Sequence, residues 1–484
     1  MTGATATALA LPCGHVRAAD RFVNPLGIPA LLEGKKDGGA DTLRFDLAIA
    51  SGTSNFLPGL STPTIGINGP YLGPTIRCRA GDHAAFRVKN SLDEPTTLHW
   101  HGFHIPARYD GGPHQVIEPG RVWEPTFEIK QKASLFWYHS HLIEQTGEQV
   151  ARGLAGLFLV EDEEARALQL PSEYGVDDIP LVIQDRRFSS DGSLEYMTSM
   201  GDAEVGYQGD VILVNGTVDP YLELRRQRTR LRILNGSNSR IYMLGRDDGA
   251  DLLVIGSDGS LLERPARMKR VRLAPAERIE LLVDMRPGQR VTLTSYSLPG
   301  TMGDMRMRGG NGGAFPIVEL RAASKPEPAN SPIPERLIKV PSWNPAQAAR
   351  TRTFTLNMMT MSIGRWTGPA MELPMGINGR SMDMNRINVR VPLGSVEIWE
   401  IRNATLLPHP FHIHDIQFRV LDRDGAPPQP YEQGLKDTVL VDSGSTVRVI
   451  TEFADFADPD HPYMYHCHNL EHEDAGMMGQ FVVV

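Results

Sequence analysis

The sequence predicts an all-β protein of three consecutive β-sandwich domains, and three observations support this prediction. The chain has 484 residues, too many for one hydrophobic core, which suggests two to four domains. Its 47 Gly and 36 Pro make it rich in turns, which favours many short strands over long helices. A block of strand-like sequence also occurs three times along the chain.

Each block begins with an Asn-Gly turn and ends with a second asparagine that closes a strand. The turns are Asn68-Gly69, Asn215-Gly216 and Asn378-Gly379, and the closing residues are Asn90, Asn235 and Asn403. Between them, apolar and polar residues alternate with a period of two, as in half-buried strands. Repetition on this scale predicts repeated β-sandwiches. We place the domains at 40–162, 175–322 and 350–484, joined by a charged linker and a Pro-rich one.

Composition excludes some classes of function. The net charge is −9 and no Lys/Arg stripe is present, which argues against nucleic acid as a partner. No apolar run approaches the ~20 residues that span a bilayer, so we expect a soluble, monomeric protein. The apolar stretch 4–11 ends in an Ala-x-Ala-like pattern, typical of the remnant of an export signal, but a disordered leader fits equally well.

The histidines are the strongest signal in the sequence. Four pairs have the spacing His-x-His, whereas a random arrangement of 15 histidines in 484 residues gives roughly 0.5 such pairs. The pairs are His99/His101, His139/His141, His412/His414 and His466/His468. Residues i and i+2 of a strand point to the same face, so each pair can present two imidazoles to one metal cluster. Two pairs come from the first block and two from the third, which predicts a cluster between those domains.

One cysteine indicates which metal is bound. Cys467 lies between His466 and His468, with His472 and Met477 downstream and His409 upstream. Two His, one Cys and a distant Met are the ligands of a blue-copper electron-transfer site. On a strand, Cys467 points away from its two neighbours, so the blue copper and the cluster lie on opposite faces. The other two cysteines, Cys13 and Cys78, form no disulfide framework; they either pair or remain separate thiols.

These motifs resemble those of the multicopper oxidase family. HWHG at 99–102, YHSH at 138–141, HPFHIH at 409–414 and HCHNLEHEDAGM at 466–477 look like its four copper signatures, in family order. Within the family the chain is most similar to the bacterial copper-efflux oxidases and laccase-like enzymes, with support from segments 153–162 and 174–192. The resemblance implies three cupredoxin-like Greek-key sandwiches, four copper ions, O2 as electron acceptor and a periplasmic or secreted location.

The resemblance also implies a role for each ligand. The type 1 copper takes His409, Cys467, His472 and Met477; the type 2 copper takes His99 and His412; the type 3 pair takes His101, His139 and His468 on one ion and His141, His414 and His466 on the other. Reduction of O2 to water consumes protons, and a carboxylate near the cluster can relay them. Asp110 and Glu473 are the predicted donors, although Asp110 also fits a purely structural role in an Asp-Gly-Gly turn.

The methionines bear on the reductant. They cluster at Met302, Met305 and Met307, at Met358, Met359 and Met361, and at Met371, Met375, Met382 and Met384. Thioethers bind Cu(I), but methionine is equally common as adaptable packing. The copper-efflux branch has an Asp and a Met just before HPxHxH, where this chain has Thr405 and Leu407. Met358 matches one retained ligand of that branch.

Three functions remain open from sequence. The first is a laccase-like oxidase that takes electrons from phenols or aromatic amines, with Cu(I) as a possible second substrate. The second is a dedicated cuprous oxidase for copper homeostasis. The third is a copper-binding or scaffold protein that keeps the cupredoxin fold without enzymatic activity, against which the complete set of ligand motifs argues.

Overall fold

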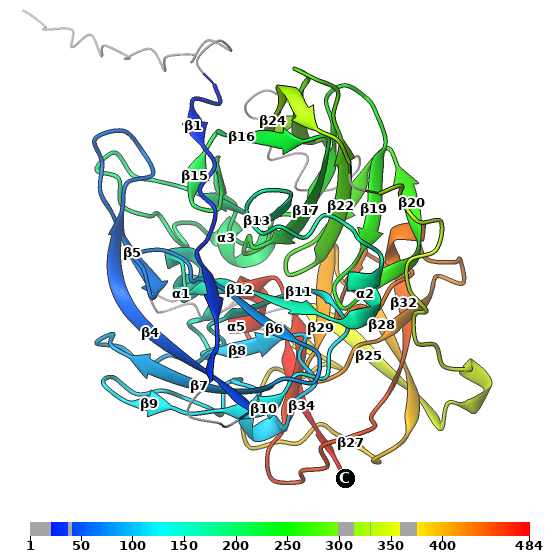
Figure 1. The fold of residues 1–484 in the computed structure, drawn as a ribbon. Coiled ribbons are helices and arrows are strands. Elements are labelled where there is room, and N and C mark those ends of the chain that lie inside the picture. Colours follow the sequence, from blue (N-terminus) through cyan, green and yellow to red (C-terminus); the bar gives the residue numbers. More distant parts are fainter. Residues whose placement is uncertain (1–20, 37–40, 299–313, 330, 359–374) are drawn as a thin grey trace, which may run out of the picture.

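The computed structural model describes residues 21–36, 41–298, 314–329, 331–358 and 375–484. Within these residues, strands dominate and pair into six sheets. Figure 1 shows three bodies of strands along the chain, coloured blue to cyan, green, and yellow to red. Each body is a cupredoxin-like sandwich of two sheets, so the prediction of an all-β chain of three consecutive sandwiches is confirmed. No helix in the described ranges is long and apolar enough to cross a membrane.

The first sandwich is built from strands in the amino-terminal third of the chain. They are β2 (Leu31–Glu33), β3 (Lys35–Lys36), β4 (Thr42–Ser54), β5 (Thr62–Ile67), β6 (Thr75–Arg79), β7 (His83–Asn90), β8 (His99–His101), β9 (Val122–Trp123), β10 (Thr126–Glu128), β11 (Ser134–His139) and β12 (Ala155–Glu161). One sheet has the order β10-β7-β4-β3, with β5 on β4 and β9 on β7. The other has the order β2-β6-β12-β11-β8, which places both histidine strands at one edge.

The middle sandwich also includes a short strand from the start of the chain, β1 (Asn24–Pro25), which pairs with β16. Its strands are β13 (Asp178–Arg186), β14 (Val211–Val214), β15 (Thr217–Val218), β16 (Pro220–Arg226), β17 (Arg228–Asn235), β18 (Tyr242–Arg246), β19 (Leu252–Gly256), β20 (Leu261–Met268), β21 (Val271–Leu273), β22 (Arg278–Asp284), β23 (Arg290–Ser295) and β24 (Phe315–Glu327). The sheets run β1-β16-β24-β23-β18-β21 and β15-β14-β13-β17-β22-β19-β20.

The third sandwich holds the remaining strands. They are β25 (Arg350–Met358), β26 (Met375–Ile377), β27 (Val389–Val391), β28 (Val396–Asn403), β29 (His409–Ile413), β30 (Arg419–Arg423), β31 (Thr438–Val441), β32 (Thr446–Glu452), β33 (Tyr463–Cys467) and β34 (Met478–Val483). The sheets run β26-β25-β28-β32-β30 and β27-β34-β33-β29-β31. The second sheet places β29 and β33, which carry the third domain's metal-ligand motifs, side by side.

The predicted repeat is visible in the asparagine contacts of all three sandwiches. Each turn asparagine has a positive φ, and its amide group bridges two residues of the strand that pairs with the strand before the turn. The Oδ1 atoms accept from the N–H of Ala48, Val182 and Thr355 respectively, each at 2.7 Å. The closing asparagines likewise each donate to two carbonyl groups across a loop. Asparagine tolerates the left-handed conformation and replaces backbone hydrogen bonds, which explains its use at these positions.

One prediction about these blocks is wrong. The polar residues of β17 were expected to face solvent, but the strand is buried on both faces. Arg232 Nε lies 2.6 Å from Asp178 Oδ1, and its Nη1 lies 2.8 Å from Glu280 Oε1. Arg230 pairs with the same glutamate. Because buried charges need partners, these ion pairs allow a strand with an alternating pattern to occupy the interior.

Three buried apolar clusters form the cores of the three sandwiches. A fourth cluster includes Leu135 and Trp137 of the first domain and Val182 and Leu234 of the middle domain, and it fills the interface between these two. Apolar burial of this kind makes the docking of the domains part of the fold. The four α-helices of the described chain are short: α1 (Thr146–Arg152), α2 (Glu163–Ala167), α3 (Met200–Val205) and α5 (Leu470–Asp474).

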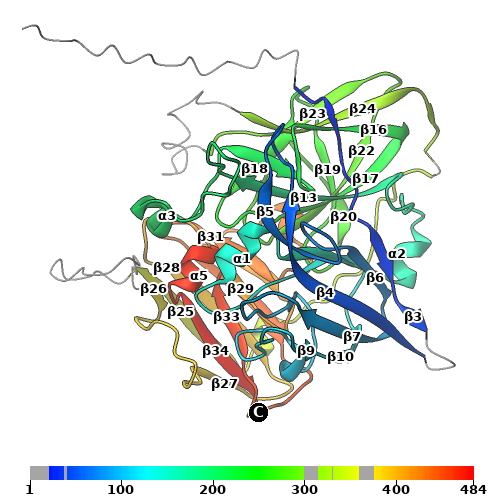
Figure 2. The same cartoon turned by 90° about the vertical axis from the view of Figure 1, so that its left-hand side faces the viewer.

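Two of these helices join the first and third domains. The Asp474 carboxylate, at the end of α5, accepts from the N–H groups of Thr146 (3.0 Å) and Gly147 (2.8 Å) at the start of α1. A carboxylate at this position satisfies N–H groups that lack a partner within the helix. Both ribbon views place α1 and α5 side by side (Figures 1 and 2). Since α5 lies between Cys467 and Met477, this contact fixes the segment that carries the predicted blue-copper ligands.

Candidate metal centres

Strand pairing brings the four His-x-His pairs together. In the first domain, β8 and β11 are antiparallel and His99 faces His139. In the third domain, β29 and β33 are antiparallel and His412 faces His466. All eight imidazoles of the four pairs are at most 1% exposed. Rings from the two domains stack on each other, with His99 and His414 centroids 3.9 Å apart, so the pairs meet between the first and third domains.

The eight imidazoles fall into three groups whose ring nitrogens face one another. Within each group the ligand atoms lie within 4.8 Å of one another. The groups are His141/His414/His466, His101/His139/His468 and His99/His101/His412. In the first group, the three Nε2 atoms are only 3.1–3.2 Å apart. Three nitrogens converging in this way are the arrangement that a shared metal ion requires.

The chemistry of these nitrogens fits copper. Nε2 of His99, Nε2 of His412 and both ring nitrogens of His468 are buried without a hydrogen-bond partner, although buried polar atoms normally have one. Burial lowers the pKa of each of these imidazoles below its ordinary value of 6.5. The rings are therefore neutral at pH 7, and neutral imidazole is the form that ligates copper.

Hydrogen bonds to the far side of each ring fix which nitrogen faces inward. Three rings donate Nδ1–H to a backbone carbonyl at 2.7–2.8 Å: His99 to Asp110, His139 to Ser140, and His412 to Asp437. These bonds leave Nε2 as the ligand atom. His101 is reversed: its Nε2 lies 3.0 Å from Asp437 Oδ1, and its Nδ1 faces His139 Nε2 at 3.4 Å.

Both predicted proton donors touch this cluster. Asp110 Oδ2 lies 2.7 Å from His414 Nδ1, while Asp110 Oδ1 is buried without a hydrogen-bond partner. Burial raises the pKa of Asp110 well above its ordinary value, which favours the protonated form of this carboxyl. Glu473 spans two rings, with Oε1 3.2 Å from His141 Nδ1 and Oε2 3.0 Å from His466 Nδ1.

A second set of ligand-type residues lies on the opposite face of β33. Cys467 Sγ is 3.3 Å from His409 Nδ1 and 3.9 Å from His472 Nδ1, and these two nitrogens are 3.1 Å apart. Met477 is fully buried, and its carbonyl accepts the N–H of Cys467 at 3.0 Å. Burial raises the pKa of the Cys467 thiol above its ordinary value. A metal ion held here would displace the thiol proton, because thiolate is the form that binds metals.

Comparison with known proteins identifies the family. Two family models, both described as multicopper oxidase, match residues 48–165 and 344–484, which together are more than half of the chain. The chain belongs to the multicopper oxidase family. This match confirms the predicted resemblance. It also supports the predictions that the chain is of an oxidoreductase family and of a copper-binding family.

The chain is similar to relatives that carry two different names. It is 35% identical to the multicopper oxidase mco of Staphylococcus aureus over 464 residues, which are 95% of this chain and 92% of that protein. It is also 35% identical to the cell division protein FtsP of Escherichia coli over 470 residues, 95% of this chain and 92% of that protein. Sequence identity alone therefore does not separate an oxidase from a division protein.

Solved structures agree over the whole fold. A laccase-like multicopper oxidase CueO from Ochrobactrum sp., with oxidase activity towards lignin model compounds, superposes with a TM-score of 0.84 at 36% identity and covers 95% of this chain and 100% of that one. A multicopper oxidase of Campylobacter jejuni, described as a metallo-oxidase, gives a TM-score of 0.83 at 29% identity, with 96% of both chains covered.

The methionine clusters are only partly described. Met302, Met305, Met307, Met359, Met361 and Met371 lie outside the described residues. Met375 is fully buried in the core of the third domain, and Met358 is half-buried against the same core. For Met375, the packing role is therefore sufficient to explain the residue.

Three further residues contact the histidines of the two sites, and of these the sequence had singled out only Thr405. The Thr405 hydroxyl lies 2.7 Å from His409 Nε2, and the Glu204 carbonyl, from the middle domain, lies 3.1 Å from His472 Nε2. Asp437, which follows no known ligand spacing, contacts His101 and His412. None of these residues belongs to a repeated motif, so only the folded structure brings them to the histidines.

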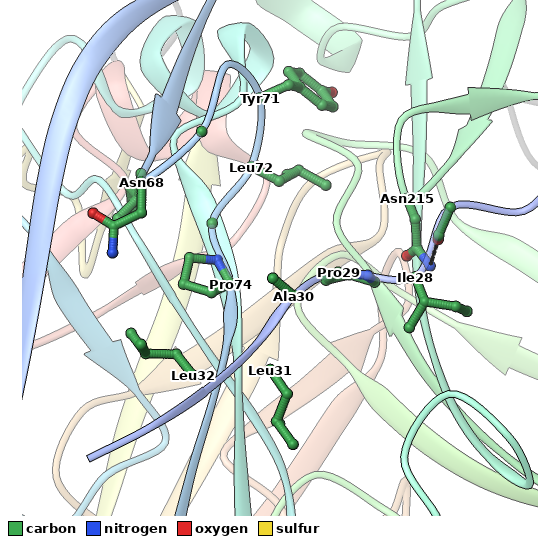
Figure 3. Close-up of a pocket in the computed structure, with 14 residues that line it drawn as sticks. Ile28, Pro29, Ala30, Leu31, Leu32, Asn68, Tyr71, Leu72, Pro74 and Asn215 are labelled. Atoms are coloured by element: carbon green, nitrogen blue, oxygen red, sulfur yellow. Dashed lines mark hydrogen bonds between the residues drawn. The ribbon is translucent and has the colours of Figure 1, made fainter. Parts of the chain in front are cut away.

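A cavity of about 330 Å³ lies apart from the histidines. Segments 27–32, 67–69 and 71–74, together with Asn215, line it (Figure 3). Its lining is largely apolar and includes no His, Cys, Asp or Glu. It therefore offers no metal ligands and no acid–base groups for the chemistry of the family.

Proposed function

We propose that this chain couples one-electron oxidation of small phenolic or aromatic reductants to the reduction of O2 to water. The proposed ligands of the type 1 copper are His409, Cys467, His472 and Met477; those of the type 2 copper are His99 and His412; those of the type 3 pair are His101, His139 and His468 on one ion and His141, His414 and His466 on the other. When bound, these ions supply one-electron acceptance from the reductant and four-electron delivery to O2.

One observation carries the proposal: three consecutive residues reach two different sites. Cys467 Sγ lies 3.3 Å from His409 Nδ1, in the thiol site. His466 Nε2 lies 3.1 Å from His414 Nε2, in the histidine cluster, and His468 belongs to another group of that cluster. A few backbone bonds therefore connect the thiol to both sides of the cluster. This link explains how a reductant at one site can serve O2 at the other.

Two carboxylates lie close enough to the histidine cluster to deliver protons to it. Reduction of O2 to water consumes four protons, which must reach a site with no exposed imidazole. Asp110, with its raised pKa and its contact to His414, can hold a proton beside the cluster. Glu473 contacts His141 and His466 from the other side. We propose that both act in proton delivery.

The surroundings of His409 favour an organic reductant. Thr405 places a neutral hydroxyl, not a carboxylate, 2.7 Å from His409 Nε2. The next residue, Leu406, is 81% exposed. A cuprous ion gains little from a hydroxyl and a leucine, because it prefers thioether and thiolate ligands. An aromatic ring gains apolar contact at this position.

The surroundings of His472 also favour an organic reductant. The Glu204 carbonyl contacts His472 Nε2, and Met200, one turn earlier in α3, is 50% exposed. An exposed apolar residue thus lies three positions before His409, and another lies one helical turn before the residue that contacts His472. Exposed apolar residues beside a functional group are typical of binding sites for apolar partners. The similarity to a laccase-like enzyme that acts on lignin model compounds supports the same class of reductant.

A dedicated cuprous oxidase is the second candidate. The solved relative described as a metallo-oxidase favours it, as does Met358, which matches one ligand position of the copper-efflux branch. Thr405 and Leu407 count against it, because that branch has Asp and Met at these positions. A non-enzymatic scaffold is the third candidate, favoured by the similarity to FtsP and opposed by the ten imidazoles that converge on the two sites.

We further propose that the chain acts as a monomer in the periplasm or outside the cell, with O2 and its reductant as its small-molecule partners. Support comes from the family chemistry and from the export-like stretch at residues 4–11, which lies outside the described residues.

Oxygen uptake by the copper-loaded protein tests these alternatives. It should be measured with a phenol, with Cu(I), and with no reductant, each with and without excess Cu(II). We expect rapid uptake with the phenol in the absence of added Cu(II). Uptake with Cu(I) alone would favour the cuprous oxidase. A protein that binds copper but consumes no O2 with any reductant would contradict the oxidase and favour the scaffold.

A further inference from the structure

The middle domain carries no histidine, yet one of its arginines ends beside the histidine cluster. Arg278 is 1% exposed and uses all five guanidinium N–H groups. Nε donates to the carbonyl of Leu135 in the first domain at 3.0 Å. Nη1 and Nη2 donate to the carbonyls of Ala276 (3.0 Å) and Asp258 (2.9 Å) in the middle domain. The remaining two groups form a bidentate pair with Asp437 of the third domain, at 2.7 and 2.5 Å.

Asp437 in turn contacts two proposed copper ligands. Its Oδ1 lies 3.0 Å from His101 Nε2, and its backbone carbonyl lies 2.8 Å from His412 Nδ1. Because each of these oxygens accepts a hydrogen bond, the ring nitrogen that faces it must carry the proton. The lone pair is therefore on Nδ1 in His101 and on Nε2 in His412. One residue sets opposite ring orientations for ligands from two domains.

The close approach of this pair explains the glycine in the HWHG motif. Gly102 follows His101 and has φ +84°, a conformation that favours glycine. A Cβ at this position would lie 2.4 Å from Asp437 Oδ2 and 3.1 Å from Arg278 Nη2. Contacts this short cannot be accommodated without displacing the ion pair. The absence of a side chain at Gly102 thus leaves room for the contact between Arg278 and Asp437.

We propose that Arg278 is a positioning residue of the trinuclear copper centre: it holds the Asp437 carboxylate in the one orientation that directs the His101 Nδ1 lone pair at the metal. The middle domain, in this view, completes the cluster that forms between the other two. This inference rests on the proposed function, because His101 and His412 are proposed copper ligands. Second-sphere groups that orient an imidazole commonly change metal affinity or activity by about 10- to 100-fold.

A second ion pair across the same two domains provides a matched control. Arg272 of β21 forms a bidentate pair with Asp442, at 2.8 and 2.7 Å. Its two side chains are 27% and 44% exposed, and the pair has no histidine partner among the described residues. Removing Arg272 shows what the loss of an ion pair between these two domains does to the copper sites when no histidine is involved. If Arg278 orients His101, the two positions behave differently.

The test compares Arg278→Met, Arg278→Lys, Asp437→Asn and Arg272→Met in the full copper-loaded chain. Three quantities are measured: copper bound per chain, the blue absorption of the thiolate site, and the EPR signal of the cluster. For Arg278→Met and Asp437→Asn we expect a 10- to 100-fold weaker affinity for the cluster copper and an altered EPR spectrum, with the blue absorption retained. Lysine keeps the charge but not the bidentate geometry, so Arg278→Lys should recover only part of the loss. Arg272→Met should match the wild type in all three.

Several results would overturn the inference. Full copper content with an unchanged EPR spectrum in both Arg278→Lys and Asp437→Asn would do so, even if Arg278→Met failed to fold. Equal losses of copper affinity and EPR signal in Arg272→Met would show that Arg278 acts only as a docking contact between the domains. The proposed function fails separately, and the inference with it, if the wild-type chain binds no copper at all.

Discussion

The two candidate sites are only one residue apart along β33, yet they are built differently. The thiol site draws His409, Cys467, His472 and Met477 from one domain. The histidine cluster takes four imidazoles from the first domain and four from the third, and its outer contacts reach the middle domain through Asp437 and Arg278. The thiol site thus takes all its ligands from one sandwich, although Glu204 of the middle domain contacts His472, whereas the cluster forms only when the first and third sandwiches dock. We therefore expect that the proposed electron-accepting site and the proposed site of O2 reduction can be disrupted separately.

The largest effect is expected from removing the thiolate. Cys467→Ser should lose the blue absorption and reduce O2 consumption to the uncatalysed level, because the two sites act as one unit. The cluster should still bind its copper, since none of its imidazoles changes. Cys78→Ser is the matched control: Cys78 is also buried, but it lies in β6 of the first domain. Oxygen consumption that survives in Cys467→Ser would contradict the assignment.

Asp110→Asn should affect the cluster and leave the thiol site intact. The amide keeps a polar contact to His414 but cannot deliver a proton, and loss of a positioned proton donor typically costs about 10²–10⁴-fold in rate. Steady-state O2 uptake measures the loss, and the blue absorption should stay unchanged. A rate within about twofold of the wild type would show that Asp110 has only its structural role in the turn.

Sequence accounted for much of the fold and of the inner ligands, for physical reasons that particular residues illustrate. Alternation along a strand predicted that Cys467 and His466 face opposite sides, and the structure places them in separate sites. The turn residues Asn68, Asn215 and Asn378 predicted the threefold repeat. These signals are local, because they depend on spacing within one strand or one turn.

The residues around the ligands were not predictable in the same way. Arg278 lies 159 positions from Asp437, and Asp437 lies 336 positions from His101, so no spacing rule connects them. His104 fits none of the ligand motifs, yet it bridges the first and third domains through Asp415 and Asp455. The burial of β17 also escaped prediction, because its arginines find partners on other strands.

A smaller effect should change the choice of reductant at the thiol site. Thr405→Asp places a carboxylate beside His409, where the copper-efflux branch has one. We expect the ratio of Cu(I) to phenol turnover to rise about tenfold, which corresponds to ~1.4 kcal/mol of added attraction for the cation. Competition assays with both reductants measure this ratio, and Thr405→Ser serves as the neutral control. An unchanged ratio would mean that position 405 does not contact the reductant.

The smallest effect concerns the docking of the first and third domains. His104 Nδ1 lies 2.8 Å from Asp415 Oδ1, and its Nε2 lies 3.2 Å from Asp455 Oδ2. Although burial lowers the pKa of His104, these two carboxylates together raise it above its ordinary value of 6.5. A raised folded-state pKa stabilises the protein below pH 6.5, and this stabilisation is lost as pH rises through the folded-state value.

His104→Gln should therefore be less stable than the wild type at pH 6, by ~0.5–1 kcal/mol, and nearly equal to it at pH 9. Thermal unfolding of the copper-free chain at both pH values measures the difference. His461→Gln, which alters an exposed histidine paired within its own loop, is the control. A constant difference between wild type and His104→Gln across this range would show that His104 does not titrate with the domain contact.

The most direct test of the central claim is a copper titration of the wild-type chain followed by visible absorption. If Cys467 faces one metal while His466 and His468 face a trinuclear centre behind it, an intense blue thiolate–copper band should develop and the chain should saturate at four copper ions. Saturation at four ions without the blue band, or a blue band in a chain that saturates at one ion, would contradict the account.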